Sequence, residues 1–589
     1  MIEKIYSDSK ISIENHFKVS AGPGAGKTYW LINHIKNVLA NSDRLHKTRK
    51  IACITYTNTA VQEIETELSD VEKSRVEIGT IHSFLYNNLV KPFLFLLKDS
   101  SGEELVNLKY LNGHEEHIPR RNNFRKWLEN HWSKKRYDLL NSNKYQSVIK
   151  CLKNLDWKFN DNEELILALR RNCIGIASEI KFPYSSLTHE QFLAYKKYYW
   201  RKGEIHHEDV LYFSYRILKE NPRIIKFLNN KFPYIFIDEF QDTNPIQTKI
   251  IKKLGKKQSI VGVIGDSAQS IYKFQGATRN DFLSFNLEGL KEYYIPDNRR
   301  STENIIKFIT KIRNNKLKQN CVREIEGEKV TIIVGDRIEA SSYLRDLYDN
   351  VVILARNNEL VGQLKNNTTK KLGNIWDESM ALDSNYWRQK FLYSIVYAVE
   401  LLGQNRNKEA LKKVLKFFKT KDQKGKYVTK DKARKYTIKV LEMIYKNKSE
   451  RLNKLVIDFY NQIINYIKKR YNIKLYSNLS KRGKYYKKFS SQYTYKDLIQ
   501  ALKIKDDTSN IRTIHKAKGA EFKKVLLVVE ERDMDYIFNP CIDSMSDNTR
   551  IYYVGCSRTI DNLFINVPSL DYNNELTKIC NIKKVENIK

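Results

Sequence analysis

Cysteine and proline are scarce in this sequence, whose 589 residues include only 7 cysteines and 10 prolines. The cysteines are scattered, with no CxxC pair and no cysteine–histidine cluster at zinc spacing, so neither a disulfide framework nor a structural metal is indicated. No uncharged apolar run approaches the ~20 residues of a membrane-spanning helix, and the opening MIEKIYSDSK contains no apolar signal segment. These absences predict a cytoplasmic protein with no membrane partner.

Acidic residues are also few, because 68 Asp and Glu stand against 104 Lys and Arg, giving a formal net charge of +36. Between residues 404 and 497 the chain has 28 Lys and Arg but 7 Asp and Glu, interleaved with tyrosine and phenylalanine. This clustering favours a nucleic-acid partner. A solvated basic face is the plain alternative. An anionic membrane is disfavoured, because the sequence has no lipidation motif and no cleanly basic amphipathic helix.

The stretch SAGPGAGKT, residues 20–28, is a glycine-rich loop between a strand-like run and a segment with helical apolar spacing. In that context the pattern indicates a phosphate-binding Walker A site. Its glycines let backbone N–H groups converge on a phosphate, Lys27 reaches the β- and γ-phosphates, and Thr28 is placed to bind Mg²⁺. We therefore predict that ATP is held by Ala21, which stands in the place of the usual first glycine, Gly22, Pro23, Gly24, Ala25, Gly26, Lys27 and Thr28.

A second pattern, YIFIDEFQDTNPIQ at residues 234–247, reads as a buried parallel strand that ends in two carboxylates. Asp238 is predicted to bind Mg²⁺ and Glu239 to orient and deprotonate an attacking water, since phosphoryl transfer depends on positioning and on neutralising charge. A surface acid pair is the alternative, although surface acids rarely end an all-apolar strand.

The segment DEFQDTN resembles the UvrD/Rep/PcrA branch of superfamily 1 helicases. Further stretches match that branch in order: ACITYTNTAVQEI (52–64), GTIHSF (79–84), VIGDSAQSIYKFQGA (263–277), DNRRST (297–302), TIHKAKGAEF (513–522) and YVGCSRT (553–559). The resemblance implies an α/β fold with two RecA-like P-loop domains, each with a parallel sheet and a mainly helical insertion.

The spacing of the motifs gives the expected domain organisation. Some 210 residues separate Thr28 from Asp238, too many for a compact βαβ core, and a second gap separates Arg300 from Thr513. We expect residues 1–87 and 206–290 to form the first core, 88–205 a helical insertion, 291–359 and 506–589 the second core, and 360–505 a basic helical insertion.

Gln269 follows an apolar strand closed by Gly265 and Asp266, a position from which its amide could sense the γ-phosphate or cap a turn. Tyr272 and Phe274 alternate beyond it, and their spacing fits base stacking and core packing equally well. The resemblance favours stacking, because Phe274 and Tyr56 match aromatic residues that stack on bases in the family.

Other roles come from the resemblance alone. Arg300 and Arg558 match arginines that point at the γ-phosphate from the second core, where they would neutralise transition-state charge. Glu521 is implied to contact the ribose. The resemblance places single-stranded or tailed DNA against Thr55, Tyr56, Thr57, Asn58, His82, Tyr272, Phe274, Thr513, His515 and Lys518.

The sequence departs from the family at the base of the nucleotide. The family has an adenine-reading glutamine upstream of the phosphate loop, whereas the first glutamine here is Gln62. Arg299 replaces the aromatic residue that usually stacks on adenine, although a guanidinium can stack too. Selectivity for ATP over other nucleotides is therefore not predicted.

The sequence as a whole predicts an ATP-dependent DNA translocase or helicase, with 3′→5′ polarity implied by the resemblance. The alternative is a nucleotide-gated sensor of DNA ends that activates a nuclease without processive unwinding; an RNA helicase is disfavoured, because TxHxxKGxEF belongs to the DNA-directed branch. The compact length and GTIHSF followed by LVKPF resemble the helicase component of Gabija anti-phage systems. That resemblance implies an OLD-type ATPase and nuclease as partner.

Overall fold

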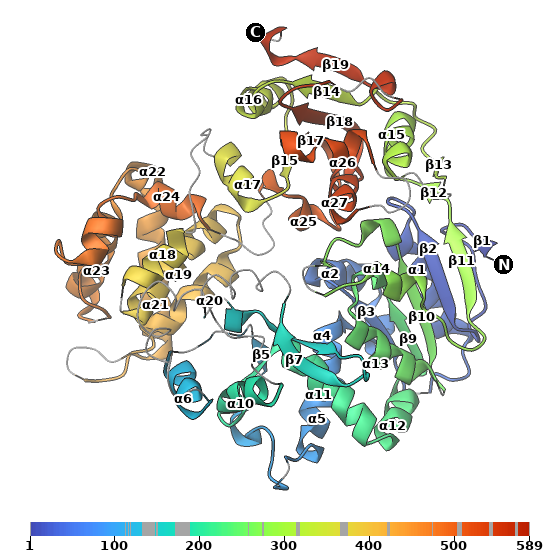
Figure 1. Cartoon of the computed structure of the whole chain (residues 1–589), viewed down its shortest axis with the longest axis horizontal. Helices are drawn as coiled ribbons and strands as arrows, with labels where there is room; N and C mark the ends of the chain where they lie inside the picture. The colour runs from blue at the N-terminus through green and yellow to red at the C-terminus, as the bar shows by residue number, and fades with distance from the viewer. Residues whose placement is uncertain are drawn as a thin grey trace.

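The computed structural model has two sheet-containing lobes, each with an attached insertion (Figure 1). The described residues are 2–46, 48–99, 101–111, 113–115, 117, 119, 121–131, 148, 151–170, 189–256, 258–273, 276–313, 318–365, 375–383, 385–420, 425–473, 475–502, 509–540, 546–571 and 575–587.

The first lobe is built on a seven-stranded sheet whose strands are all parallel. Every residue of its central strands β9 and β10 is buried, as expected for a parallel sheet covered by helices on both faces. In spatial order the strands are β1 (Glu3–Lys4), β11 (Lys291–Ile295), β2 (Phe17–Ala21), β10 (Ile260–Gly265), β9 (Tyr234–Ile237), β3 (Ile51–Thr55) and β4 (Val76–Thr80).

The second lobe is built on a six-stranded sheet, also parallel throughout. The order is β16 (Ile511–Thr513), β15 (Val352–Ala355), β17 (Phe522–Val528), β18 (Thr559–Val567), β14 (Thr331–Val334) and β19 (Asn581–Lys584). Two parallel sheets covered by helices confirm the predicted α/β fold class.

Helices flank both sheets (Figure 1), as the apolar periodicity after the phosphate loop predicts. Those of the first lobe are α1 (Lys27–Asn41), α2 (Asn58–Glu67), α3 (Asp70–Arg75), α4 (Ile81–Leu85), α5 (Lys91–Phe93), α11 (His207–Glu220), α12 (Arg223–Lys231), α13 (Pro245–Gly255) and α14 (Arg279–Leu283). Those of the second are α15 (Glu303–Arg313), α16 (Arg337–Leu347), α17 (Asn358–Lys365), α25 (Ile514–Ala517), α26 (Asp535–Phe538) and α27 (Asp547–Cys556).

The first insertion contains strands where the sequence analysis expected helices. An antiparallel hairpin joins β6 (Leu155–Phe159) to β7 (Leu165–Leu169), because Leu155, Trp157 and Leu167 alternate with more exposed residues. The insertion shares one hydrophobic core with the first sheet, so it is not an independent unit. Its other elements are β5 (His114–Glu115), β8 (Ile205–His206), α6 (Arg121–His131) and α10 (His189–Trp200).

The second insertion is helical, as expected, and lies at the left of Figure 1 with a separate hydrophobic core of its own. Most of its described lysines face outward: on α21, for example, Lys432, Lys435 and Lys439 are exposed, as is Arg434, while Val440 is buried. The helices are α18 (Ile375–Leu382), α19 (Tyr386–Gly403), α20 (Asn407–Phe418), α21 (Lys430–Lys446), α22 (Lys448–Arg451), α23 (Val456–Tyr471) and α24 (Tyr495–Gln500).

The boundary between the lobes differs from the one expected after residue 290. Strand β11 pairs with β2 in the first sheet, so residues 291–295 lie in the first lobe. The chain leaves that sheet at β12 (Asp297–Asn298), which pairs with β13 (Asn320–Cys321). Among the described residues, no helix is both long and apolar enough to span a bilayer.

The close packing of β10 on β2 gives a test of this core. Gly262 lies opposite Phe17, and a Cβ atom at Gly262 would come within 2.0 Å of the Phe17 ring. Gly262→Ala should therefore destabilise the protein by about 1–3 kcal/mol, measured as a lower thermal unfolding midpoint. At Gly79 the nearest atom is 3.9 Å from the added Cβ, so Gly79→Ala is the matched control. Equal stability of both variants would contradict this packing.

Candidate active site

The carboxyl ends of the first sheet's strands gather the residues predicted to handle the nucleotide. Because the strands are parallel, these ends share one edge of the sheet, where open α/β sheets bind ligands. The glycine-rich loop follows β2, the acid pair follows β9, and Gln269 follows β10. The edge therefore unites segments 210 positions apart, such as Thr28 and Asp238.

The glycine-rich loop is shaped to receive an anion. Gly24 and Gly26 adopt left-handed φ angles of 68° and 75°, which glycine tolerates without strain. Helix α1 begins directly afterwards, with no side-chain cap and no acid in its first turn, so its free N–H groups and its dipole favour a phosphate. Lys27 Nζ donates to the Gly22 carbonyl at 3.2 Å, across the loop that ATP would enter.

The predicted Mg²⁺ ligands lie together. Thr28 Oγ1 donates to Asp238 Oδ2 at 3.5 Å, and the Asp238 side chain is buried at the end of β9. A hydroxyl and a carboxylate oxygen form a hard donor set that suits Mg²⁺ completed by water and phosphate oxygens. Glu239 follows in a left-handed conformation with φ of 53°, and the Gln241 amide donates to its carboxylate.

Burial and the neighbouring Glu239 raise the pKa of Asp238 to about 7. Burial alone would also raise the pKa of Glu239, but Lys27 and Lys518 hold it below its ordinary value. The pKa values of the two adjacent carboxyl groups are thus shifted in opposite directions. Glu239 is ionised at neutral pH, as a proton acceptor must be, while Asp238 is poised to lose its proton when a cation approaches.

The second lobe touches the phosphate loop directly. A Cβ atom on Gly24 would lie 2.5 Å from Asn298 Oδ1 and 2.7 Å from Arg300 Cβ, so only glycine fits there. Arg299 donates its backbone N–H to the Gly24 carbonyl at 2.8 Å, while its exposed side chain pairs with Asp297. The Gln319 amide donates to the Pro23 carbonyl at 3.0 Å.

Arg558 lies between α27 and β18, is 2% exposed, and meets Gln269 of the first lobe. Its Nη2 donates to Gln269 Oε1 at 2.9 Å, and its other partners are carbonyls and a serine hydroxyl. Within the described residues it forms no ion pair with a carboxylate. Burial and the nearby Arg300 lower its pKa to about 9, so it keeps a positive charge that an arriving phosphate would neutralise.

Arg300 and Glu521, both predicted to contact the nucleotide, bind each other. Arg300 Nε lies 2.6 Å from Glu521 Oε2, and Arg300 Nη1 donates to the Ser557 carbonyl at 3.0 Å. Arg300 is therefore held next to Arg558 in this structure, with its charge balanced by Glu521.

Lys518 is placed differently from the prediction that it faces the nucleic-acid backbone. Its side chain is 5% exposed and its Nζ donates to Asp242 Oδ2 and, at 2.6 Å, to the Gln269 carbonyl. Asp242, which the sequence analysis did not single out, has a pKa raised to about 7 by burial against the opposing effect of Lys518. Its position in DEFQD, four residues after Asp238, is the sequence feature from which Asp242 could have been identified as a site residue.

Aromatic residues from two segments form a stack beside this ion pair. The rings of Tyr56 and Tyr272 lie 4.9 Å apart with an interplanar angle of 26°, and Lys518 Nζ lies 4.9 Å from the Tyr272 ring. The Tyr272 hydroxyl donates to the His515 carbonyl at 3.4 Å. The structure thus brings Tyr56, Tyr272, His515 and Lys518 together, while Phe274 lies outside the described residues.

The remaining residues that were predicted to contact DNA make contacts within the protein in this structure. Thr57 caps α2 by accepting the Ala60 N–H, and Asn58 is the first residue of that helix. Thr55 and Thr513 end β3 and β16 and are buried; Thr55 Oγ1 has no hydrogen-bond partner among the described residues.

His82 lies with His114 of the first insertion and His207 of α11 rather than with the aromatic stack. Its ring centroid is 6.4 Å from that of His114 and 6.0 Å from that of His207. Burial and these two rings lower the pKa of His82 to about 3, so it is neutral at physiological pH and supplies no charge to a DNA phosphate. The nearby acids Glu208 and Asp209 pair with the buried Lys196, whose ammonium stands where a cation would bind.

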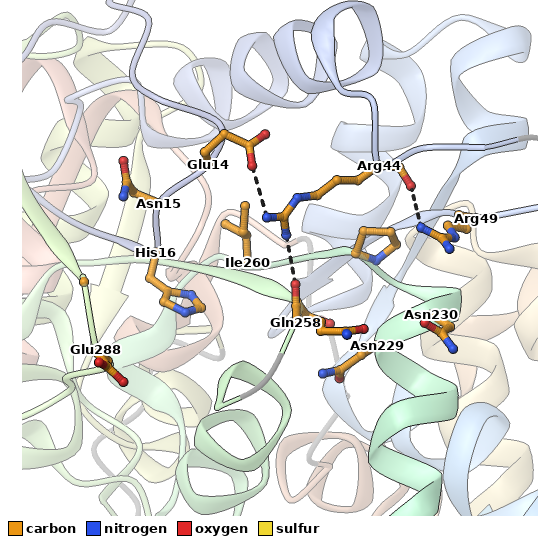
Figure 2. A pocket seen from close by; sticks show the side chains of 13 residues that line it. Glu14, Asn15, His16, Arg44, Arg49, Asn229, Asn230, Gln258, Ile260 and Glu288 are labelled. Carbon is orange, nitrogen blue, oxygen red and sulfur yellow. Dashed lines mark hydrogen bonds and ion pairs between the residues drawn. The ribbon is translucent and has the colours of Figure 1, made fainter.

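A polar hollow of about 530 Å³ lies at the opposite, amino-terminal edge of the first sheet (Figure 2). Its arginines are already satisfied: Arg44 pairs with Glu14 at 3.1 Å and donates to the Gln258 carbonyl, and Arg49 donates to the Arg44 carbonyl. It shares no residue with the nucleotide site.

Two family models match the chain, and together they cover more than half of it. The UvrD/REP helicase N-terminal domain matches residues 6–288, and the UvrD-like helicase C-terminal domain matches residues 495–569. Gabija protein GajB of Bacillus cereus is 28% identical over 365 residues, covering 56% of this chain and 52% of that protein. ATP-dependent DNA helicase PcrA of Staphylococcus epidermidis is 25% identical over 351 residues, covering 56% and 42%. The chain thus spans about half the length of the curated relatives it matches.

The raised pKa of Asp238 predicts a stability effect with a defined sign. Between pH 4 and 7 the folded state keeps a proton that the unfolded state has lost, so this group makes the protein less stable as pH rises. Without divalent cations, Asp238→Asn should raise the melting temperature at pH 8 by several degrees, and the gain should vanish near pH 4.

Asp266 is the control of opposite sign, because Arg313 holds its pKa below the ordinary value despite burial. Asp266→Asn should lower the melting temperature at pH 8. A loss of stability in Asp238→Asn at pH 8 would contradict the raised pKa.

Proposed function

This chain belongs to the UvrD-like helicase family, and from that premise we propose that it is an ATP-driven motor that moves along single-stranded DNA with 3′→5′ polarity. The observation that carries the proposal is the meeting of Arg558, from the second lobe, with Gln269, from the first, beside the phosphate loop and the acid pair. We place this activity in the cytoplasm.

In the proposed reaction the first lobe binds the nucleotide and the second completes the site. The phosphates lie in the Ala21–Thr28 loop with Lys27 against the β- and γ-phosphates, and Mg²⁺ held by Thr28 and Asp238 would neutralise phosphate charge. Glu239 accepts a proton from the attacking water, and Gln269 orients that water. Arg558 and Arg300 then turn from Gln269 and Glu521 toward the terminal phosphate and stabilise the charge of the transition state.

Hydrolysis produces movement because these groups belong to different lobes. With a triphosphate present, Arg558 gains a counter-charge and Arg300 exchanges Glu521 for the phosphate only if the cleft is closed; after phosphate release that attraction is lost and the lobes can separate. The Lys518 contacts to Asp242 and to the Gln269 carbonyl connect this cycle to the Tyr56–Tyr272 stack, through which we propose that bases pass.

The basic second insertion supplies the second part of the proposed DNA path. Exposed basic residues lie on α21, at the end of α23 (Lys468, Lys469, Arg470), and at 481–488, where their side chains can reach phosphates. We expect fewer specific contacts to the nucleobase than in the family, since Arg299, which replaces the stacking aromatic residue, is exposed and paired with Asp297. We therefore propose weak discrimination between ATP and other nucleoside triphosphates.

The alternative function is a nucleotide-gated sensor of DNA ends that activates a partner nuclease. The similarity to a Gabija protein supports a role in anti-phage defence, with cleavage done by an OLD-type ATPase and nuclease partner. A 3′-tailed duplex separates the two functions, because a motor releases the displaced strand in proportion to the ATP it hydrolyses. A sensor hydrolyses ATP and releases none.

Glu239→Gln tests the hydrolytic role. The amide cannot accept a proton, so DNA-stimulated ATP hydrolysis should fall by about a hundredfold or more, while binding of ATP and DNA persists. Lys27→Ala is the comparison, since it should lose ATP binding itself. Turnover of Glu239→Gln within a few-fold of the parent would remove Glu239 from the mechanism.

Tyr56→Ala tests the stacking role. Loss of one stacked base should weaken binding of single-stranded DNA by roughly 1–3 kcal/mol, measured by fluorescence anisotropy, while basal ATP hydrolysis continues. Tyr110, which is 61% exposed in the first insertion, gives the control variant Tyr110→Ala. Unchanged DNA affinity in Tyr56→Ala would indicate that the Tyr56 ring packs within the protein and does not stack on bases.

A further inference from the structure

A short segment after β10 leaves the first sheet and is packed into the second lobe. Residues 266–272 contain Gln269, and two of their apolar side chains, Ala268 and Ile271, belong to the hydrophobic core formed by α15, α27 and the second sheet. Arg550 of α27 also donates its Nε to the Ser270 carbonyl at 2.9 Å. Gln269 therefore rests on the second lobe although it is joined to the first.

Arg313, the last residue of α15, anchors the start of this segment. Arg313 is 7% exposed, and its guanidinium binds both carboxylate oxygens of Asp266: Nη1 donates to Oδ2 at 3.1 Å, and Nη2 lies 3.0 Å from Oδ1. Nη1 also donates to the hydroxyl of Tyr553 on α27 at 3.0 Å. Arg313 and Asp266 thus form a buried, bidentate ion pair between the two lobes.

Asp266 in turn fixes the side-chain amide of Gln269. Asp266 Oδ2 accepts Gln269 Nε2 at 2.8 Å, and Oδ1 accepts the Ala268 N–H at 3.0 Å. Because the nitrogen of the Gln269 amide is engaged in this way, its oxygen faces the cleft and meets Arg558. A continuous chain of contacts runs from Arg313 through Asp266 and Gln269 to Arg558.

We propose that Arg313 is a positioning residue for hydrolysis, which sets the orientation of the Gln269 amide through Asp266. This rests on the proposed function. Removing the guanidinium would leave a buried carboxyl group that favours its neutral form. A protonated Asp266 would lack the negative charge that holds the Gln269 amide nitrogen and could offer that amide a donor as well as an acceptor, so the amide could turn and no longer present its oxygen to the attacking water. Since Arg313 and Tyr553 lie in the second lobe, Gln269 is correctly oriented only while the lobes are in contact.

The test compares Arg313→Met and Arg313→Lys, each alone and in a Gln269→Ala background, by steady-state ATP hydrolysis with single-stranded DNA. Arg313→Met should lower kcat about tenfold with the KM for ATP within roughly threefold, because it changes a water-orienting group and not ATP binding. In the Gln269→Ala background the same substitution should cost no further activity, since the residue through which it acts is gone. Arg313→Lys keeps the charge without the fork, and should show a smaller loss that also disappears in Gln269→Ala.

Arg388→Met is the matched control. Arg388 forms a comparable two-pronged pair with the buried Asp383, with Nε donating at 2.8 Å, but inside the second insertion and away from the cleft. It should leave kcat and KM unchanged within about twofold. If Arg313→Met does not fold, the Arg313→Lys series decides the question by itself.

The contrary outcomes are distinct. Equal losses from Arg313 substitution with and without Gln269, or a change confined to KM, would overturn the positioning role. Failure of the proposed function would be seen separately, as parent hydrolysis that Lys27→Ala does not abolish.

Discussion

A buried positive charge without a carboxylate partner in the described structure organises the cleft between the lobes. Arg558 is supported by carbonyls, a hydroxyl and the Gln269 amide, which orient its guanidinium but do not neutralise it. Such a group is costly to bury unless an anion joins it. The second lobe therefore places an unbalanced charge against the loop that the first lobe has shaped for phosphate, and the attraction between the two gives the closed cleft its dependence on ligand.

The sequence was sufficient for features that depend on local chemistry and strand order. A glycine loop after an apolar strand and an acid pair after another had to meet, because parallel strands deliver their carboxyl ends to one edge. The sequence did not predict other contacts between residues that come from distant segments of the chain. Lys518 is held by Asp242, and burial together with His207 and His114 keeps His82 neutral; no motif spacing encodes these contacts. Arg313 likewise has no local signal, since its role exists only where two lobes touch.

The two insertions differ in how they are held, and this bears on their contribution. The first merges its apolar residues with the core of the first lobe, so it moves with the nucleotide-binding sheet. The second insertion has a hydrophobic core of its own, and most of its described lysines face outward. Its basic, helical pattern therefore depends on residues within the insertion and could be predicted from that segment of the sequence alone. The β6–β7 hairpin was missed because its five-residue strands carry a short alternation that is easily read as helical.

The central claim is that a triphosphate pulls Arg558 away from Gln269 and onto its terminal phosphoryl group. A structure determined with Mg²⁺ and a non-hydrolysable ATP analogue measures this directly. The account predicts that the guanidinium groups of Arg558 and Arg300 both lie within hydrogen-bonding distance of the γ-phosphate, with the Arg300–Glu521 pair broken. A structure in which Arg558 still binds Gln269 while only the first lobe contacts the phosphates would contradict it.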